Sequence, residues 1–455
     1  MNSHLPPFLF AWNACAERAR QPLSVAAEQA SRRSWYDTLA TMAAGTAENC
    51  TRAALQACEI PEGGALSAVD AALVLGTASH ALDYDDVCML ATCHPSAPPI
   101  SALLGLLPQL MREREGITLS DLLAAHLVGT ETMLRLGAWL GFRHYALGFH
   151  ATSTLGTVGS AAAVAHALQL PDRAAHAALS IAASSACGLR ANFGSDVKPL
   201  HVGLAAAAGG RAGLLARAGI EASNDVWQAN GFELAFNGGE PVLPIDWGTK
   251  IDWAIVHPGF EFKRYPSCYL SHRLIAGILA IRARQPAATW SQPVKISIEV
   301  AHNGLAALKY PQPRTGLQGK FSGPYCAAVA WIDGAVGLAS FSDVAVQRPA
   351  VLAGMQHVRL RERAPAGEQL DTAPVYVVVC GKDWSDTIKV DWAPGSSADP
   401  VTRSQMTQKV QDCLDYGGLN RLAGVLTQIM DAPLDAPVSL LMPLREAMLS
   451  ARKTG

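Results

Sequence analysis

A long stretch rich in alanine and leucine, residues 23–283, constrains this chain more than any other feature. These residues have high helix propensity, and the small alanine side chain lets helices approach closely. After Pro286 the pattern changes, because residues 294–300 alternate with period two and residues 375–380 and 387–390 are β-rich around a turn. The sequence therefore predicts a large all-α helical domain followed by a smaller α+β domain.

We expect three segments along the 455 residues, a length that fits two or three domains of about 100–200 residues each. Residues 1–285 would form the helical domain and residues 286–400 a smaller α+β lid domain. Short amphipathic pieces follow in residues 401–455, and we expect them to be C-terminal helices that pack on either domain.

The composition excludes several classes of protein. A net charge of -2 argues against a nucleic-acid partner, and apolar runs such as residues 100–111 are shorter than the ~20 residues needed to cross a membrane. Charged residues make up 16%, against about 25% in ordinary globular proteins, so we expect surface to be buried between subunits of a homo-oligomer.

Cysteine usage and the N-terminus both favour a cytoplasmic protein. Ten cysteines are scattered without a C-x-x-C pair, as expected for reduced thiols. Residues 5–16 are apolar, but no basic residue precedes them, so we do not interpret them as a signal peptide.

Motifs for cofactors are absent from the sequence. Neither a dinucleotide-binding G-x-G-x-x-G nor a phosphate-binding G-x-x-x-x-G-K-[ST] is present. The histidines do not form H-E-x-x-H, and no set of potential ligands has the spacing of a metal site. We therefore predict no cofactor and no metal.

Acidic residues follow an apolar helical segment at Asp83, Asp85 and Asp86, and His94 comes shortly afterwards. His80 and Asp83 would share a helical face at i, i+3 spacing, whereas Asp85 would point elsewhere. Carboxylates at this negative end of a helix need compensation by a cation. Taken alone, solvated acids at a helix end are the simpler interpretation.

Two further segments place titratable groups at predicted helix starts. His150 precedes hydroxyl residues that can cap a helix, and a positive helix end favours the neutral form of histidine that a general base needs. Lys198 lies at the unfavourable end of its helix dipole, which either lowers its pKa or reserves it for an anionic ligand. A structural role is the simpler explanation for the histidine, but not for the lysine.

A basic loop, with Lys263 and Arg264, precedes another predicted helix. The two could be a solvated charge pair. Together with Lys198, His150 and His94, they could instead line one cationic pocket at the domain junction, where ligand sites often lie.

These four segments, in this order and spacing, resemble the MmgE/PrpD family, and residues 320–334 resemble its second domain. The resemblance implies a large helical domain, a smaller α+β lid, a homodimer and a metal-free site between the domains. It implies active-site groups at six positions: Asp83, His94, His150, Lys198, Lys263 and Tyr310. His201 and His272 fall in the same motifs, and we expect them, with Arg264, among the substrate-binding residues.

The family members include 2-methylcitrate dehydratase, cis-aconitate decarboxylase and iminodisuccinate epimerase. Where the first two carry a threonine, this chain has Val87. That departure favours a cofactor-independent epimerase of a small, iminodisuccinate-like dicarboxylate, with His150 on one face and Tyr145 or Lys198 on the other. The alternative is a lyase of the dehydratase or decarboxylase type, and a non-catalytic helical interaction protein is a remote alternative.

Overall fold

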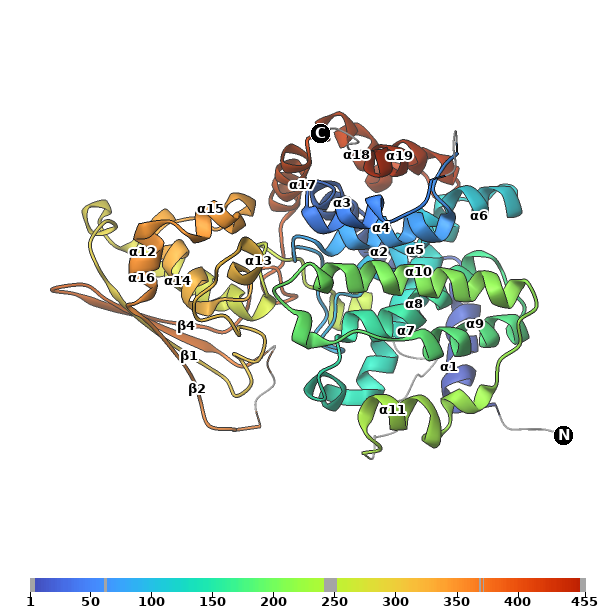
Figure 1. Ribbon diagram of the computed structural model, residues 1–455, viewed down its shortest axis with the longest axis horizontal. Helices are drawn as coiled ribbons and strands as arrows, with labels where there is room; N and C mark the ends of the chain where they lie inside the picture. The colour runs from blue at the N-terminus through green and yellow to red at the C-terminus, as the bar shows by residue number, and fades with distance from the viewer. Residues whose placement is uncertain (1–4, 61–63, 241–251, 368–369, 371, 451–455) are drawn as a thin grey trace.

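The computed structural model describes residues 5–60, 64–240, 252–367, 370 and 372–450. Its larger part is a bundle of helices, and its smaller part carries a four-stranded sheet that projects to one side (Figure 1). The helices of the larger part are α1 Pro7–Ala19, α2 Val25–Gly45, α3 Asn49–Gln56, α4 Ala68–His80, α5 Ala97–Gly105, α6 Leu107–Glu113, α7 Leu119–Ala146, α8 Ala151–Ala167, α9 Asp172–Ser185, α10 Val197–Arg217 and α11 Leu234–Asn237.

Helix α10 packs against α4, α8 and α9 in the bundle. Small residues allow this packing: a side chain added at Gly76 of α4 would place its Cβ 2.7 Å from the Gly203 Cα of α10. The alanine-rich composition thus produces close backbone contact rather than large interdigitating side chains. No described helix is both long and apolar enough to span a membrane.

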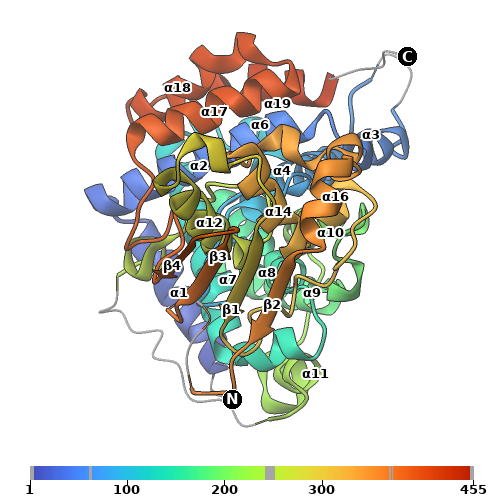
Figure 2. The same ribbon diagram turned by 90° about the vertical axis from the view of Figure 1, so that its left-hand side faces the viewer.

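The sheet of the smaller part has the strand order β2-β1-β3-β4. Its strands are β1 Lys295–Val300, β2 Val358–Glu362, β3 Val375–Cys380 and β4 Ser385–Val390. Strands β1 and β2 pair in parallel, and the other two pairings are antiparallel. Alternate residues of β1 are buried, as its period-two pattern predicts. Figure 2 faces the sheet, with helices behind it.

The predicted fold class, an all-α domain with an α+β lid, is wrong in its second half. That part is itself rich in helix, with α12 His272–Arg284, α14 Gly323–Asp333 and α16 Pro349–Met355 beside one small mixed sheet. Helix α12, which its composition assigned to the helical domain, packs on β3 and β4. Composition records helix propensity but not the surface on which an apolar helix face packs.

The C-terminal segment returns to the helical bundle (Figure 1, red beside blue). Its helices are α17 Arg403–Gly417, α18 Ala423–Asp431 and α19 Met442–Ser450. Helices α17 and α18 contact α2, so the C-terminal helices share a core with α2.

A buried polar network crosses the bundle at His126 of α7. Its Nδ1 lies 2.8 Å from the Ser31 Oγ and its Nε2 lies 3.1 Å from the Ser96 Oγ. Ser96 in turn donates to the Asp86 carboxylate over 2.5 Å. Burial lowers the pKa of His126 to about 3 and raises the pKa of Asp86 to about 7.

We predict that the protein loses stability as the pH falls from about 7 to about 5. Burial lowers the pKa of His126, His80 and His272 to about 3, whereas in the unfolded chain each histidine titrates near its ordinary value. Below about pH 6.5 the unfolded state therefore binds more protons, and each such histidine costs about 1.4 kcal/mol per pH unit. Asp86 acts in the opposite direction, because its raised pKa makes the folded state bind a proton in this range.

Denaturant unfolding at several pH values measures this slope, with His126→Gln as the comparison. The three histidines outweigh one aspartate, so stability should fall on acidification, and the slope of the variant should be smaller by about one proton. A stability that is constant or rises towards pH 5 would contradict the expectation.

Candidate active site

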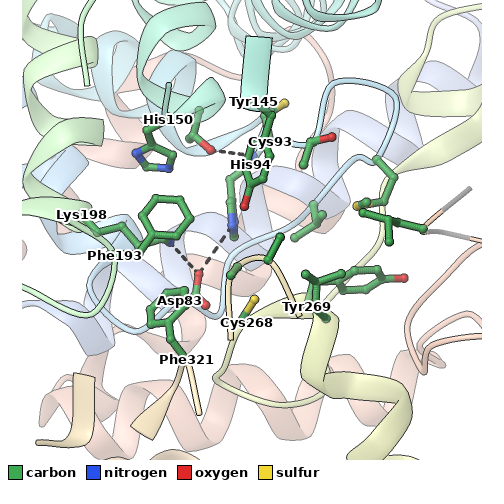
Figure 3. Close-up of a pocket in the computed structure, with 18 of the residues that line it drawn as sticks. Asp83, Cys93, His94, Tyr145, His150, Phe193, Lys198, Cys268, Tyr269 and Phe321 are labelled. Carbon is green, nitrogen blue, oxygen red and sulfur yellow. Dashed lines mark hydrogen bonds and ion pairs between the residues drawn. The ribbon is translucent and has the colours of Figure 1, made fainter. Parts of the chain in front are cut away.

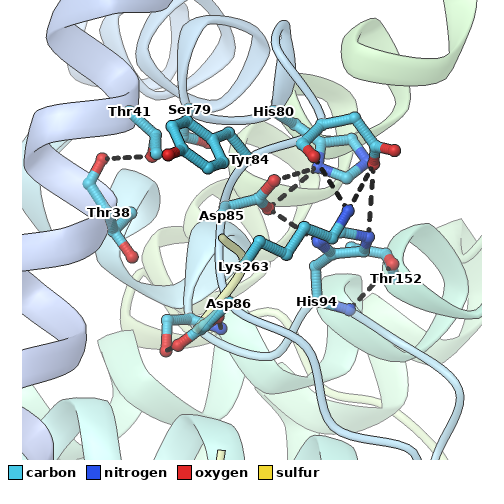
Figure 4. Close-up of polar contacts among 12 residues, drawn as sticks. Thr38, Thr41, Ser79, His80, Tyr84, Asp85, Asp86, His94, Thr152 and Lys263 are labelled. Atoms are coloured by element: carbon cyan, nitrogen blue, oxygen red, sulfur yellow. Dashed lines mark hydrogen bonds and ion pairs between the residues drawn. The ribbon is translucent and has the colours of Figure 1, made fainter. Parts of the chain in front are cut away.

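The turn after α4 determines where the acidic side chains point. The helix ends at His80, and Asp83 adopts a left-handed backbone conformation with φ 52°. Helical spacing therefore does not extend to Asp85, whose side chain was expected to point elsewhere. Instead, Asp85 faces both His80 and His94 (Figure 4). The Asp86 carboxylate accepts from Ser96.

Asp83 is the centre of a buried charge cluster. Its Oδ1 lies 2.8 Å from the Lys198 Nζ and 3.1 Å from the Lys263 Nζ, and all three residues are buried. Burial raises the pKa of the Asp83 carboxyl, but the ammonium groups of the two lysines outweigh it, so the pKa lies well below its usual value. Asp83 is thus an anion that neutralises cations from two other segments. Figure 3 shows its contact with Lys198.

Asp85 orients two histidines. Its Oδ2 lies 2.8 Å from the His80 Nδ1 and 3.1 Å from the His94 Nδ1. The Nε2 of His80 lies 2.6 Å from the Lys198 Nζ, and because an ammonium can only donate, His80 must carry its proton on Nδ1. Burial raises the pKa of the Asp85 carboxyl, but the two histidines lower it by more than burial raises it. The pKa therefore lies well below its usual value, and Asp85 is ionised.

His150 is the residue immediately before α8, and its ring is paired with His201. The two Nδ1 atoms lie 3.1 Å apart, so one ring donates and the other accepts, and their tautomers are coupled. Burial, followed by the charge of Lys198, lowers the pKa of His150 well below its usual value. His150 is therefore neutral at neutral pH, chiefly because of burial rather than the helix end, and its role as a base stays a prediction.

These groups line one cavity between the bundle and the sheet-bearing part. Of the predicted site residues, the cavity is lined by Asp83, His94, Tyr145, His150, Lys198 and Lys263. The remaining walls are largely apolar, formed among others by Val87, Met89, Phe193, Leu270 and Phe321. The charged side chains of Asp83, Lys198 and Lys263 thus lie together with His94 in a cavity whose other walls are largely apolar.

Four predicted residues do not line this cavity. His201 lies behind His150, as described above, and the buried His272 has its Nε2 3.3 Å from the Ser267 carbonyl oxygen. The Tyr310 hydroxyl donates to the Phe193 carbonyl over 2.7 Å. The backbone carbonyl of Arg264 accepts from the Tyr84 hydroxyl over 3.4 Å.

Sequence reasoning gave no role to His80 or Asp85, although it noted both. Both are fully buried and orient the site residues. The polar residues His80, Asp83 and Asp85 between apolar neighbours could have indicated this role. The assumption that the helix continues to Asp85, however, places its side chain away from the site.

Atoms of His80, Asp83, Asp85 and His94 lie within 4.8 Å of one another and include donor types that bind metals. In this arrangement, however, Lys198 already donates to the His80 Nε2 and to Asp83, and Lys263 contacts the same carboxylate oxygen. A divalent cation would have to displace two ammonium groups, so these donors fit lysine neutralisation better than metal binding.

Comparison with known proteins identifies the family to which this chain belongs. The MmgE/PrpD N-terminal domain matches residues 13–243, and the MmgE/PrpD C-terminal domain matches residues 265–423. The chain belongs to the MmgE/PrpD family. Among the curated proteins similar to this chain, human cis-aconitate decarboxylase is 31% identical over 300 residues. These residues cover 64% of this chain and 60% of the human protein.

Two further relatives carry the same activity in their names. Mouse cis-aconitate decarboxylase is 29% identical over 356 residues, or 74% of this chain and 70% of the relative. The enzyme from Aspergillus terreus is 29% identical over 308 residues, or 64% and 62%. The chain thus spans less than two thirds of the human and fungal relatives. None of these three relatives is named as an epimerase, so the epimerase expectation has no support here.

We predict that a polycarboxylate binding in this cavity takes up protons. Burial lowers the pKa of His80 to about 3 and lowers the pKa of His94 and His150, so the free site holds neutral histidines at neutral pH. A bound polyanion favours the charged imidazolium and raises these pKa values. Affinity for tricarballylate should therefore increase as the pH is lowered through the raised pKa values of the bound state.

Calorimetry in two buffers of different ionisation enthalpy measures the protons taken up. His94→Gln should reduce the uptake, because it removes a titratable ring that contacts two carboxylates. Identical binding enthalpies in both buffers would contradict the prediction.

Proposed function

We propose that this chain is a lyase that acts on a small polycarboxylate of the cis-aconitate class and removes one carboxylate as CO2. The observation that carries the proposal is the convergence of Asp83, His94, His150, Lys198 and Lys263 on one cavity. Support also comes from the three decarboxylases among its relatives. The coarser statement, an enzyme of the MmgE/PrpD family, is established by the family match.

Decarboxylation needs groups that bind carboxylates and stabilise a carbanion. When the C–C bond to the departing carboxylate breaks, its electron pair stays on the substrate and spreads onto a neighbouring conjugated carboxylate. Lys198 and Lys263 are placed to bind such carboxylates, because both ammonium groups reach the cavity from buried positions. Asp83 holds them in place before the substrate arrives.

A proton must then be returned to carbon. Burial raises the pKa of the Tyr145 phenol to about 12, so it keeps its proton at neutral pH and lines the cavity as an acid. His94 and His150 lie in the same cavity and can donate once a bound polyanion has raised their pKa values. The proposal assigns the return of the proton to this group of three.

A hydro-lyase acting on an alkyl-substituted citrate is the second candidate. The apolar wall formed by Val87, Met89 and Leu270 suits an alkyl substituent, and Val87 is almost fully buried. Replacement of threonine by Val87 was the basis of the epimerase expectation. Position 87 is a single residue, whereas the similarity to the decarboxylases extends over 300 residues or more.

The reaction is tested by incubating the enzyme separately with cis-aconitate, 2-methylcitrate and iminodisuccinate in D2O. We expect CO2 release from cis-aconitate and one deuterium on carbon in the product, followed by NMR. His150→Asn and Lys198→Met should each lower turnover by about 100-fold, the contribution of a general acid–base or charge-stabilising group.

The control is Arg445→Met, which removes a buried cation from α19 far from the cavity and should retain turnover per folded molecule. An alkene formed from 2-methylcitrate without CO2 would support the hydro-lyase instead. Stereoisomer exchange in iminodisuccinate without either product would overturn the lyase proposal.

A further inference from the structure

Three consecutive backbone carbonyls, from Leu82 to Tyr84, each accept a hydrogen bond from a buried lysine. The Nζ of Lys320 donates to the Leu82 oxygen over 2.8 Å, and the Nζ of Lys263 donates to the Asp83 oxygen over 2.9 Å. The Nζ of Lys409 donates to the Tyr84 oxygen over 2.7 Å. The three lysines come from three separate segments of the chain.

This turn requires partners outside itself. Asp83 has φ 52°, and the residues on either side are buried beyond the end of α4, where helical hydrogen bonds are no longer available. Charge-assisted bonds are roughly twice as strong as neutral ones, so the lysines satisfy these carbonyls well. Lys409 also has a counterion, because its Nζ lies 2.6 Å from the Asp37 carboxylate.

Lys320 extends to this turn from the sheet-bearing part of the molecule. It follows the short helix α13 Gly316–Gly319 in the sheet-bearing part, and it is 2% exposed. Besides the Leu82 oxygen, its Nζ donates to the Pro266 oxygen over 3.0 Å. Its own carbonyl accepts from the Cys268 N–H over 3.0 Å, and this backbone bond anchors the same loop a second time.

One ammonium group thus joins two segments that carry site residues. Leu82 directly precedes Asp83, and Pro266 lies three positions after Lys263. Because the Asp83 carboxylate and the Lys263 ammonium contact each other over 3.1 Å, a shift of either segment changes the charge cluster. The ring centre of Phe341 lies 4.8 Å from the Lys320 Nζ, so this ring packs against the ammonium group from the sheet-bearing part.

We propose that Lys320 is a positioning residue for the active site, which fixes the turn bearing Asp83 against the loop bearing Lys263 from the sheet-bearing part of the molecule. Its effect on turnover rests on the proposed lyase function, whereas its effect on the two segments does not. Lys320 does not line the cavity, so it acts through Asp83 and Lys263 rather than on the substrate.

The test compares Lys320→Met, Lys320→Gln and the matched control Arg445→Met. Arg445 is also a buried cation that donates to two consecutive carbonyls, those of Leu104 and Gly105, but it does so at the far end of α5. The methionine variants each remove one buried cation and leave two carbonyls without that partner. The glutamine variant keeps an amide donor at position 320 and serves if the methionine variant folds poorly.

Two readouts are needed. Turnover of cis-aconitate is measured per folded molecule, and backbone hydrogen exchange is followed in peptides that cover residues 82–88 and 261–268. In Lys320→Met we expect kcat to fall by at least about 10-fold with a smaller change in KM, since misplacement of catalytic groups by about 1 Å can cost about 100-fold. Exchange should become faster in both segments, and Lys320→Gln should restore part of both properties.

Arg445→Met should lose stability while its kcat and its exchange in these two segments stay as in the parent protein. Unchanged kcat and unchanged exchange in Lys320→Met would overturn the proposal, as would an equal loss of kcat in Arg445→Met. The parent protein could turn over no polycarboxylate while exchange in Lys320→Met becomes faster in both segments. That result would overturn the lyase function but support the role of Lys320 in positioning the two segments.

Discussion

The ion pairs of the buried Asp83 carboxylate are the interaction on which the rest of the site depends. Lys198 lies in the first turn of α10 and Lys263 lies in a loop far along the chain, and both place an ammonium group on the same carboxylate oxygen. Without this shared anion, two buried cations would face each other in an apolar cavity. The left-handed turn at Asp83 and the lysine-capped carbonyls around it hold that anion in place.

Under the proposed function, this arrangement prepares the site for a polyanionic substrate before it binds. The lysines are already neutralised, so substrate carboxylates must share or displace the contact with Asp83, and neutral histidines nearby can take up protons to balance the added charge. Asp85 orients His94, which lines the cavity, and His80, which accepts from Lys198. The largely apolar walls and the burial of the charged groups lower the local dielectric and strengthen these electrostatic interactions.

Local patterns predicted much of the secondary structure but less of the site. Period-two alternation located β1, and β-rich composition around a turn located β3 and most of β4, whereas the charged edge strand β2 at Val358–Glu362 was missed. The direction of the Asp85 side chain depends on the left-handed backbone conformation of Asp83. A glycine at that position would have indicated such a conformation, but the sequence has an aspartate there. Lys320 reaches the Leu82 carbonyl across 238 positions, and no local pattern shows which buried carbonyl lacks a partner.

The most direct test of the account is a crystal structure of the protein with tricarballylate bound. The account predicts one ligand carboxylate within hydrogen-bond distance of both the Lys198 and the Lys263 ammonium groups. The carbonyls of residues 82–84 should keep their three lysine partners. A ligand bound with its carboxylates away from both lysines, while Asp83 keeps them fully paired, would contradict the central claim.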